Sequence, residues 1–414
     1  MAIHDRDFTG NLPKMLAAKL KFEALKMHFW GKWAVFNAPG DRVTVDKNNV
    51  PVTKQSPIVM QHELEKSQGD RLMIPVMRNL VNLPTVGMDQ LKGHEELQKM
   101  NFAQVPIDIV RHAVKPQEGI MSTQTSKDYG LLTNAKPQLL RHYAEVEEYL
   151  GATYAFYYGY SWNVLNSSRW TGNSVNVSAN SHPHVFVAGH GKVSSTGVYP
   201  GTAGYETIIG TAITAMDDTN VFDTNFLSGL KASQDIAYID PLISKDGNQF
   251  RLIVAHPYQI ATLEADTKFT SISATANAIQ MAKDNPMLTG VKYFWAGFAI
   301  FSSDTAVWPV TVSGGDPVWG PTTITNMTSF KTYSTYTKFA AIILGNNALF
   351  KAMGQKHQFK KRVDDYDEII GIAMRAVEGY SRGDFFNEDD GTRGDALINH
   401  GSAVLVTYAD APGF

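Results

Sequence analysis

The 414-residue chain contains no cysteine, and this absence excludes disulfide bonds, thiolate metal ligands and a cysteine nucleophile. It also has no window near the ~18 uninterrupted apolar residues that a membrane-spanning helix needs. Residues 1–7 show no basic region that leads into an apolar segment, as a secretory signal would. We therefore expect neither a membrane span nor secretion.

An excess of charge of either sign is also missing, because the net charge is only −3 and the isoelectric point is near 6.5. Sequence-independent nucleic-acid binding depends on clustered lysine and arginine that displace counterions from phosphates. The nearest such cluster lies at residues 356–362, and four carboxylates follow it within residues 364–368. The positive and negative charges of this segment cancel, which is typical of a solvated protein surface. A nucleic acid enclosed by this protein would therefore bind its inner surface only weakly.

Catalytic motifs are scarce, since the chain has no phosphate-binding glycine loop, dinucleotide fingerprint or histidine–glutamate metalloprotease motif. Residues 379–383 do match Gly-x-Ser-x-Gly, but Ser381 would be the nucleophile of a serine hydrolase only at a sharp strand-to-helix turn. The preceding residues 369–377 look helical or mixed, and His400 is the only later histidine that could serve as the base. A glycine-flanked loop is the favoured interpretation, and a hydrolase is the alternative from a different functional class.

Two polar segments carry residues of the kinds that bind metals. His182, His184 and His190 lie close together, but a proline separates the first two and no carboxylate is near, so a solvated loop is favoured over a zinc site. Residues 387–391 and Asp395 concentrate carboxylates without the ligand spacing of a calcium loop, which favours a hydrated loop over a cation bridge between subunits. We expect no catalytic residue, no metal and no cofactor.

Residues 71–78 and 105–111 place apolar side chains at every second position, which is typical of strands with one apolar face. Pro75 and Pro106 each remove a hydrogen-bond donor and fit only a sheet edge or a bulge. A charged segment, residues 91–97, lies between the two runs. The pattern predicts a two-stranded ribbon with a charged tip, and because such a ribbon is marginal in water, we expect neighbouring copies to cover it.

Apolar residues at helical spacing predict two long helices, at residues 12–36 and 136–164. The first is apolar on two sides, so it is either a terminal arm that latches onto another subunit or an ordinary core helix. Shorter elements are predicted further on: helices at 205–216 and 224–232, a strand at 251–255, a helix that opens at Pro257, an aromatic strand at 291–301 and a sheet strand at 403–408.

Several short motifs occur in an order that resembles the major capsid proteins of tailed bacteriophages, closest to the N-four-type branch of the Hong Kong 97-type capsid fold. They lie at residues 56–66, 69–70, 91–96, 111–114, 254–259, 285–290 and 343–349. The order of the motifs, rather than any single one, carries the resemblance. It extends from about residue 50 to the end of the chain, and residues 1–50 and 166–204 show nothing specific to the family.

The resemblance implies an α+β fold of the Hong Kong 97 type. Its expected parts are an N-terminal arm (1–55), an extended β-ribbon loop (56–118), a peripheral lobe with a long spine helix and an insertion (119–240, insertion 171–204), an axial lobe (241–345) and a return to the peripheral lobe (346–414). The lobes would be built from separate parts of the chain.

The function implied by the resemblance is a major capsid protein. Its copies would form the hexamers and pentamers of an icosahedral virion shell around double-stranded DNA, assembled in the bacterial host cytoplasm with portal and scaffolding or decoration proteins as partners. An alternative with the same architecture is the shell of a bacterial nanocompartment that loads cargo protein. We expect assembly contacts in the arm and the ribbon tip at Trp30, Trp33, Leu91, Gly93, Glu95 and Glu96. For the tip, contact with a neighbour's arginine or lysine and a merely solvated tip are close alternatives.

Overall fold

The structure is a computed structural model, and it describes residues 30, 33–36, 44–45, 51–52, 56–61, 71–77, 100–114, 131–156, 184–192, 204–233, 239–243, 249–271, 290–320, 336–364, 369–386, 397–399 and 401–409. Helices and strands are mixed along the chain, so the predicted α+β class is confirmed. Two sheets, of five and ten strands, dominate the described part. No described helix is long and apolar enough to cross a membrane.

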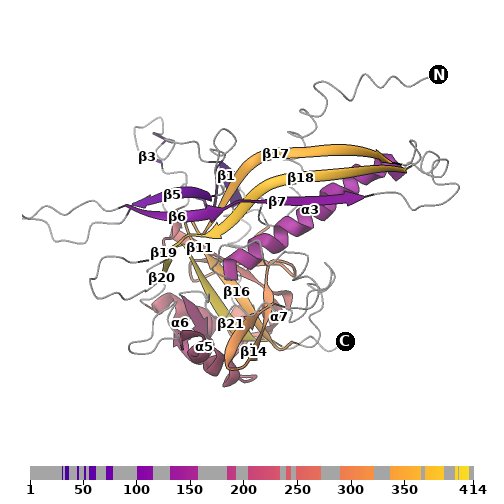
Figure 1. The fold of residues 1–414 in the computed structure, drawn as a ribbon. Helices are drawn as coiled ribbons and strands as arrows, with labels where there is room; N and C mark the ends of the chain where they lie inside the picture. Colours follow the sequence, from indigo (N-terminus) through magenta and orange to yellow (C-terminus); the bar gives the residue numbers. More distant parts are fainter. Residues whose placement is uncertain are drawn as a thin grey trace, which may run out of the picture.

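The five-stranded sheet joins segments from both ends of the chain. Its strands, in order, are β1 (Ala34–Phe36), β4 (Ile58–Gln61), β17 (Leu349–Asp364), β18 (Ile369–Arg382) and β7 (Asp108–Val114). β17 and β18 form the long antiparallel hairpin at the top of Figure 1. The prediction of helical or mixed structure at 369–377 is wrong, because buried and half-buried residues alternate along β18 with the period of a strand.

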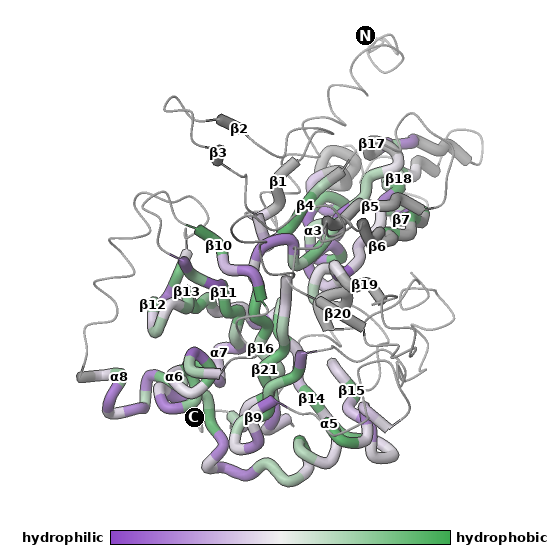
Figure 2. Tube along the Cα trace, turned by 90° about the vertical axis from the view of Figure 1, so that its left-hand side faces the viewer, coloured by the Kyte–Doolittle hydropathy of each residue, from purple (hydrophilic) through white to green (hydrophobic). Residues whose placement is uncertain are grey.

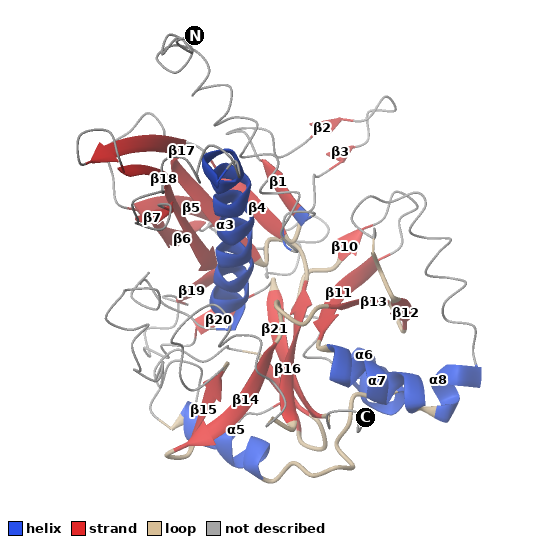
Figure 3. Cartoon of the chain, turned by 90° about the vertical axis from the view of Figure 1, so that its right-hand side faces the viewer, coloured by secondary structure: helices blue, strands red, loops and turns tan. Residues whose placement is uncertain are grey.

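Helix α3 (Leu131–Phe156) lies beside this sheet, as Figure 3 shows. The second long helix is therefore confirmed, although it begins at Leu131 rather than 136, and residues 157–164 lie outside the described residues. Its 26 residues span about 39 Å at 1.5 Å per residue. Leu139 and Tyr143 are buried against Ile372 and Met374 of β18, so one stripe of the helix is fixed on the sheet.

The predicted ribbon is present as β5 (Arg71–Met77) paired antiparallel with β6 (Met100–Pro106). Both strands are edges, which explains why Pro75 and Pro106 are tolerated. The predicted second strand, 105–111, is wrong in extent: β6 ends at Pro106, and the chain continues into β7 of the five-stranded sheet. Residues 78–99 lie outside the described residues.

The predicted helix at 12–36 is wrong at its end, where β1 is a strand parallel to β4. The Ser56 hydroxyl donates to the Trp33 carbonyl and bridges the two segments. The free edge of β4 offers backbone hydrogen bonds that override the helical spacing of the sequence, since tertiary context outweighs helix propensity. Most of residues 12–32 lie outside the described part.

The ten-stranded sheet gathers strands from the second half of the chain with two from the predicted insertion. Its main path is β12 (Tyr293–Trp295), β13 (Phe298–Ser302), β11 (Gln249–Ala255), β16 (Lys338–Leu344), β21 (Ser402–Tyr408), β8 (Val185–Val187) and β9 (Gly191–Lys192). β10 (Leu242–Ile243) pairs with β11, and β14 (Trp308–Ser313) pairs with β16 and with β15 (Asp316–Trp319). The predicted sheet position of 403–408 is thus confirmed.

The other helices in the described part of the chain are α5 (Tyr205–Thr214), α6 (Thr224–Ala232), α7 (Pro257–Ala265) and α8 (Thr267–Ser271). They confirm the two short predicted helices and the helix that opens with Pro257, whose N-cap is His256. Two small pairs lie apart from the large sheets: β2 (Thr44–Val45) with β3 (Pro51–Val52), and β19 (Asp384–Phe386) with β20 (Leu397–Asn399).

One prediction about the second half needs correction. The single aromatic strand at 291–301 is two strands, β12 and β13, because Ala296 (φ 54°) and Gly297 (φ 86°) form a two-residue turn of the kind that closes hairpins. Strands β8 and β21, which lie outside residues 241–345, join strands of that region in one sheet, and the division into lobes stays a prediction. The open edge of β16 accepts β21 along its whole length.

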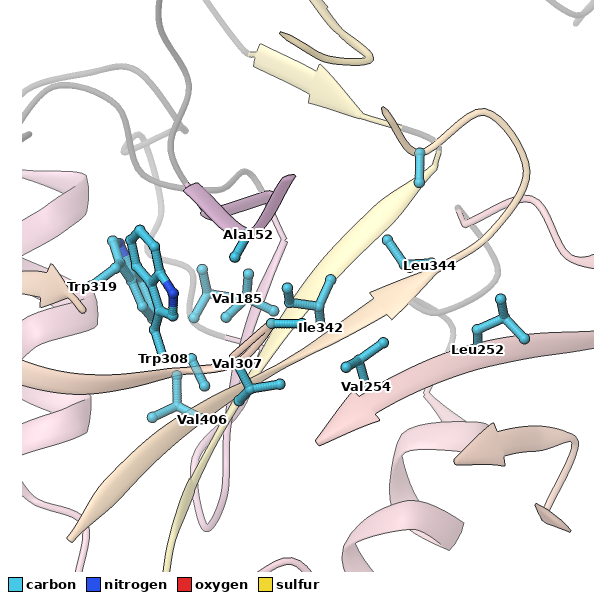
Figure 4. Close-up of a cluster of buried hydrophobic side chains, with 14 of the residues drawn as sticks. Ala152, Val185, Leu252, Val254, Val307, Trp308, Trp319, Ile342, Leu344 and Val406 are labelled. Carbon is cyan, nitrogen blue, oxygen red and sulfur yellow. The ribbon is translucent and has the colours of Figure 1, made fainter. Parts of the chain in front are cut away.

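The ten-stranded sheet is covered on both faces. Ile342 and Leu344 of β16 face one core cluster with α5, whereas Ile343 faces another with α6 and α7. Figure 2 shows the hydrophobic residues concentrated in β11, β16 and β21, and Figure 4 shows Val254, Ile342 and Val406 from these three strands in one cluster. Because both faces of these strands are buried, their sequences are continuous runs of apolar residues rather than alternating ones.

Candidate assembly surfaces and the buried ionic network

Trp30 and Trp33 lie in the core of their own chain, with 1% and 0% of their surface exposed. The indole of Trp30 donates to the Glu148 carbonyl at 2.8 Å, and the ring of Trp33 lies 4.9 Å from that of Phe301. Glu148 belongs to α3 and Phe301 to β13, so the two tryptophans join the helix to the ten-stranded sheet. Within the subunit the two tryptophans are core residues. Their predicted contacts with other subunits stay a prediction.

Gly151 of α3 lies directly against Trp30. A Cβ atom at this position would lie 2.6 Å from Cδ1 and 2.7 Å from Nε1 of the indole. The glycine costs helix stability relative to alanine, but it allows the indole to approach the helix backbone. Gly151 is therefore the place on the long helix where Trp30 of the N-terminal segment packs.

The four predicted residues of the ribbon tip, Leu91, Gly93, Glu95 and Glu96, lie outside the described residues. The base of the ribbon is described, and Figure 1 shows β5 and β6 extending from the molecule on the side opposite β7. The contacts of the tip stay a prediction.

Five side chains from α3, β17 and β18 form a buried polar network that the sequence analysis missed: Tyr143, Glu147, Lys351, Glu378 and Tyr380. Each exposes at most 2% of its surface. The Lys351 ammonium contacts Oε2 of Glu147 and lies 3.3 Å from Oε2 of Glu378. The Tyr380 hydroxyl donates to Oε2 of Glu147, and the Tyr143 hydroxyl lies 2.6 Å from Oε1 of Glu147 and contacts Oε1 of Glu378.

The network holds a proton on Glu147. Burial, reinforced by Glu378, raises the pKa of Glu147 to about 8, although Lys351 acts in the opposite direction. The geometry agrees, because a hydroxyl has one proton to donate and Tyr143 contacts both carboxyl groups. Protonated Glu147 supplies the second donor. Burial alone would lower the pKa of Lys351, but its contacts with Glu147 and Glu378 outweigh burial and raise that pKa, so Lys351 stays charged.

This arrangement is suited to holding structure rather than to chemistry. A general acid or base must reach its substrate, and these groups are closed off from solvent. The network instead fixes α3 on the hairpin of β17 and β18. A signal for it was present in the sequence, since Glu147 lies one helical turn after Tyr143 on the buried stripe and Glu378 alternates with Ala376 and Tyr380 on one strand face.

Among the other candidate sites, the favoured interpretation of residues 379–383 as a glycine-flanked loop is wrong, because residues 369–382 form strand β18. Ser381 lies within β18 opposite Phe350, and strand β19 follows rather than a helix, so the hydrolase elbow is absent. Its hydroxyl donates to the Arg382 carbonyl at 3.1 Å. Within the described residues, which include His184 and His190, no group of three or more metal-binding side chains occurs. His182, His400, 387–391 and Asp395 lie outside them.

The fold of the chain is similar to those of several solved phage capsid structures. The capsid of Ralstonia phage GP4 is 18% identical, with a TM-score of 0.61 over 87% of this chain and 89% of that chain. The cyanophage Pam1 capsid is 14% identical, with a TM-score of 0.53 over 91% and 98%. The capsid of Helicobacter pylori bacteriophage KHP30 is 10% identical, with a TM-score of 0.50 over 85% and 88%. The fold is that of phage capsid proteins of the Hong Kong 97 type.

A family model described as phage capsid protein matches residues 23–411. The chain therefore belongs to the phage capsid protein family, and it is a major capsid protein of a tailed phage, as the sequence resemblance implied. It is a structural protein of the virion capsid. No curated protein matches the sequence.

Proposed function

We propose that copies of this chain assemble into hexamers and pentamers that close as an icosahedral shell around double-stranded DNA. The observation that carries the proposal is the ribbon β5–β6: among the described residues its strands pair with each other and with neither large sheet, while its base at Val105 packs against β4 and β17. A two-stranded sheet is marginal in water by itself, so a neighbouring copy is its natural cover. The residues proposed to make that contact are Leu91, Gly93, Glu95 and Glu96.

Assembly of this kind relies on many weak contacts. A ribbon tip on the surface of a neighbour is a heterologous contact, and such contacts close into rings when the rotation allows. Each exposed ion pair contributes only ~0–1 kcal/mol. The contacts of one subunit reinforce one another because the second and later contacts form within the same complex.

We assign the two lobes to the two sheets, which moves residues 185–232 and 402–408 from the expected peripheral lobe to the axial lobe. The five-stranded sheet with α3 would form the peripheral lobe, and the ten-stranded sheet with α5 to α8 the axial lobe. The N-terminal arm, residues 1–55, would add further contacts with a neighbouring subunit. We further propose that the shell assembles in the bacterial cytoplasm, with portal and scaffolding or decoration proteins as partners. The family match to phage capsid proteins favours a virion shell over the nanocompartment alternative.

Replacement of residues 93–96 by a short Gly-Ser link tests the proposal. The variant should remain a folded subunit, with unchanged circular dichroism, and electron microscopy should show no closed shells. A matched control replaces an equal length of polar residues at 244–247, between β10 and β11, where no subunit contact is proposed. Normal particles from the 93–96 variant would contradict the proposal.

A further inference from the structure

A cleft lined by both basic and apolar residues lies on the five-stranded sheet. It has a volume of about 400 Å³ and is lined by residues of three adjacent strands, among them Arg111 of β7, Arg375 of β18 and Lys360 of β17. Ile372 and Met374 point toward α3, and successive residues of a strand point to opposite faces. Arg375 and its register partner Arg111 therefore lie on the other face.

The charges of the cleft are not balanced by described residues. Arg111 and Lys360 are exposed and Arg375 is half-buried. No described carboxylate forms an ion pair with any of the three, and Nε of Arg375 has no hydrogen-bond partner there. Like charges directly opposite one another in a sheet are destabilising. An anionic group between Arg111 and Arg375 would remove that repulsion.

The surroundings of the cleft are apolar. Ala113 of β7 pairs with Ala373 of β18, two residues along each strand from the pair of arginines. Ile109 lies two residues before Arg111 on the same face, and 45% of its surface is exposed. A ligand with carboxylates and an adjoining aliphatic side chain matches both parts of this surface. The phosphate backbone of a nucleic acid would match only the charges.

One segment of the chain has this chemistry. Residues 91–97 read Leu-Lys-Gly-His-Glu-Glu-Leu, with two adjacent carboxylates followed directly by a leucine. The segment cannot reach the cleft of its own subunit by the ribbon, because β6 and β7 run on from one another in Figure 1. Met100 and Arg111 are thus about 36 Å apart at ~3.3 Å per residue, whereas the four residues from Glu96 to Met100 span at most ~14 Å. The occupant must come from another copy.

We propose that the cleft of Arg111, Arg375 and Lys360 receives the tip carboxylates, Glu95 and Glu96, of a neighbouring copy. The proposal rests on the proposed function and names the receiving surface for the ribbon. The two glutamates pair with the two arginines, Lys360 adds a third cation, and the leucine that follows them lies against Ile109. The half-buried guanidinium of Arg375 is then the central contact.

A charge exchange tests this pairing. The double variant Arg111→Glu, Arg375→Glu should give soluble subunits with unchanged circular dichroism and a yield of closed shells reduced more than about tenfold, because the lost contact recurs in every subunit. Adding Glu95→Arg and Glu96→Arg to the same chain should restore most of the yield. Lys231→Glu, on the exposed surface of α6, is the control and should leave the yield unchanged.

Two outcomes would overturn the inference. Normal yield from the cleft variant would show that the cleft receives nothing needed for assembly, and the proposed function would still stand if the 93–96 variant forms no shells. Failure of the fourfold variant to restore shells would show that the cleft binds another partner, such as enclosed nucleic acid.

A second measurement covers the case in which charge reversal unfolds the subunit. Carbodiimide treatment of wild-type shells should join the Lys360 amine to Glu95 or Glu96 between subunits, detected as a cross-linked peptide by mass spectrometry. Its absence from shells in which other lysine–carboxylate cross-links form would count against the proposal.

Discussion

Replacement of Lys351 by methionine perturbs the buried network at its only cation. Methionine keeps an unbranched side chain but removes the ammonium that contacts Glu147 and Glu378. Glu378 would then lose its cation while 0% of its surface is exposed to water. Removing one member of a buried ion pair costs about 3–5 kcal/mol, and we expect the free energy of unfolding to fall by that amount.

Glu147→Gln is the matched comparison. Glu147 carries a proton at neutral pH, so a neutral amide of similar shape should replace it at a cost of about 1 kcal/mol, the size of one hydrogen bond. The amide oxygen can accept from Lys351 and Tyr380, and the amide nitrogen can donate to Tyr143. The two variants alter the same network but should differ several-fold in their effect.

Urea-induced unfolding of unassembled subunits at pH 7, followed by tryptophan fluorescence and far-ultraviolet circular dichroism, measures both losses. The free energy of unfolding must fall with urea concentration at a similar slope in the two variants, because this slope reports the surface exposed on unfolding. Equal losses would refute the placement of the proton on Glu147. A loss below about 1 kcal/mol for Lys351→Met, the range of exposed pairs, would refute the importance of burial.

The stability of the subunit should also depend on pH through Glu147, whose pKa rises from 4.5 to about 8 on folding. The folded state binds more protons between these two pH values, so the stabilisation from this group is fully present below pH 4.5 and is lost as the pH rises through about 8. The urea midpoints of the wild type and of Glu147→Gln should therefore diverge across this pH range, and parallel midpoint curves would contradict the pKa of Glu147. Gly151→Ala should destabilise the subunit by about 1–3 kcal/mol, because its Cβ would overlap Trp30. Gly229→Ala in α6, where a Cβ meets nothing within 4 Å, should instead stabilise it by about 0.5–1 kcal/mol, and a gain in both variants, read from thermal unfolding, would show that the indole can move aside.

Local patterns in the sequence were sufficient for several elements. The stripe of α3, the His-Pro start of α7 and the apolar run of β21 each carry a signal within one short segment. Such signals work because side-chain periodicity and the geometry of proline are properties of neighbouring residues. The alternating runs likewise predicted the ribbon, although β6 is shifted from the predicted strand.

The errors arose where a distant partner decided the outcome. Residues 369–377 mix isoleucine and valine with glycine, alanine and methionine, a local pattern that is ambiguous, and they become a strand because β17 and β7 lie on either side. Residues 34–36 follow the edge of β4 rather than their helical spacing. In each case the hydrogen bonds come from a segment that no local window contains.

The sequence by itself determined the family, through the order of short motifs, and the α+β class, through the periodicities of its segments. Only the tertiary structure decided that Trp30 and Trp33 lie in the core of the subunit, that Glu147, Lys351 and Glu378 share one buried site, and that Arg111 lies opposite Arg375. The physical reason is that burial and charge pairing depend on distances in space between residues far apart in the chain. Sequence spacing does not contain those distances.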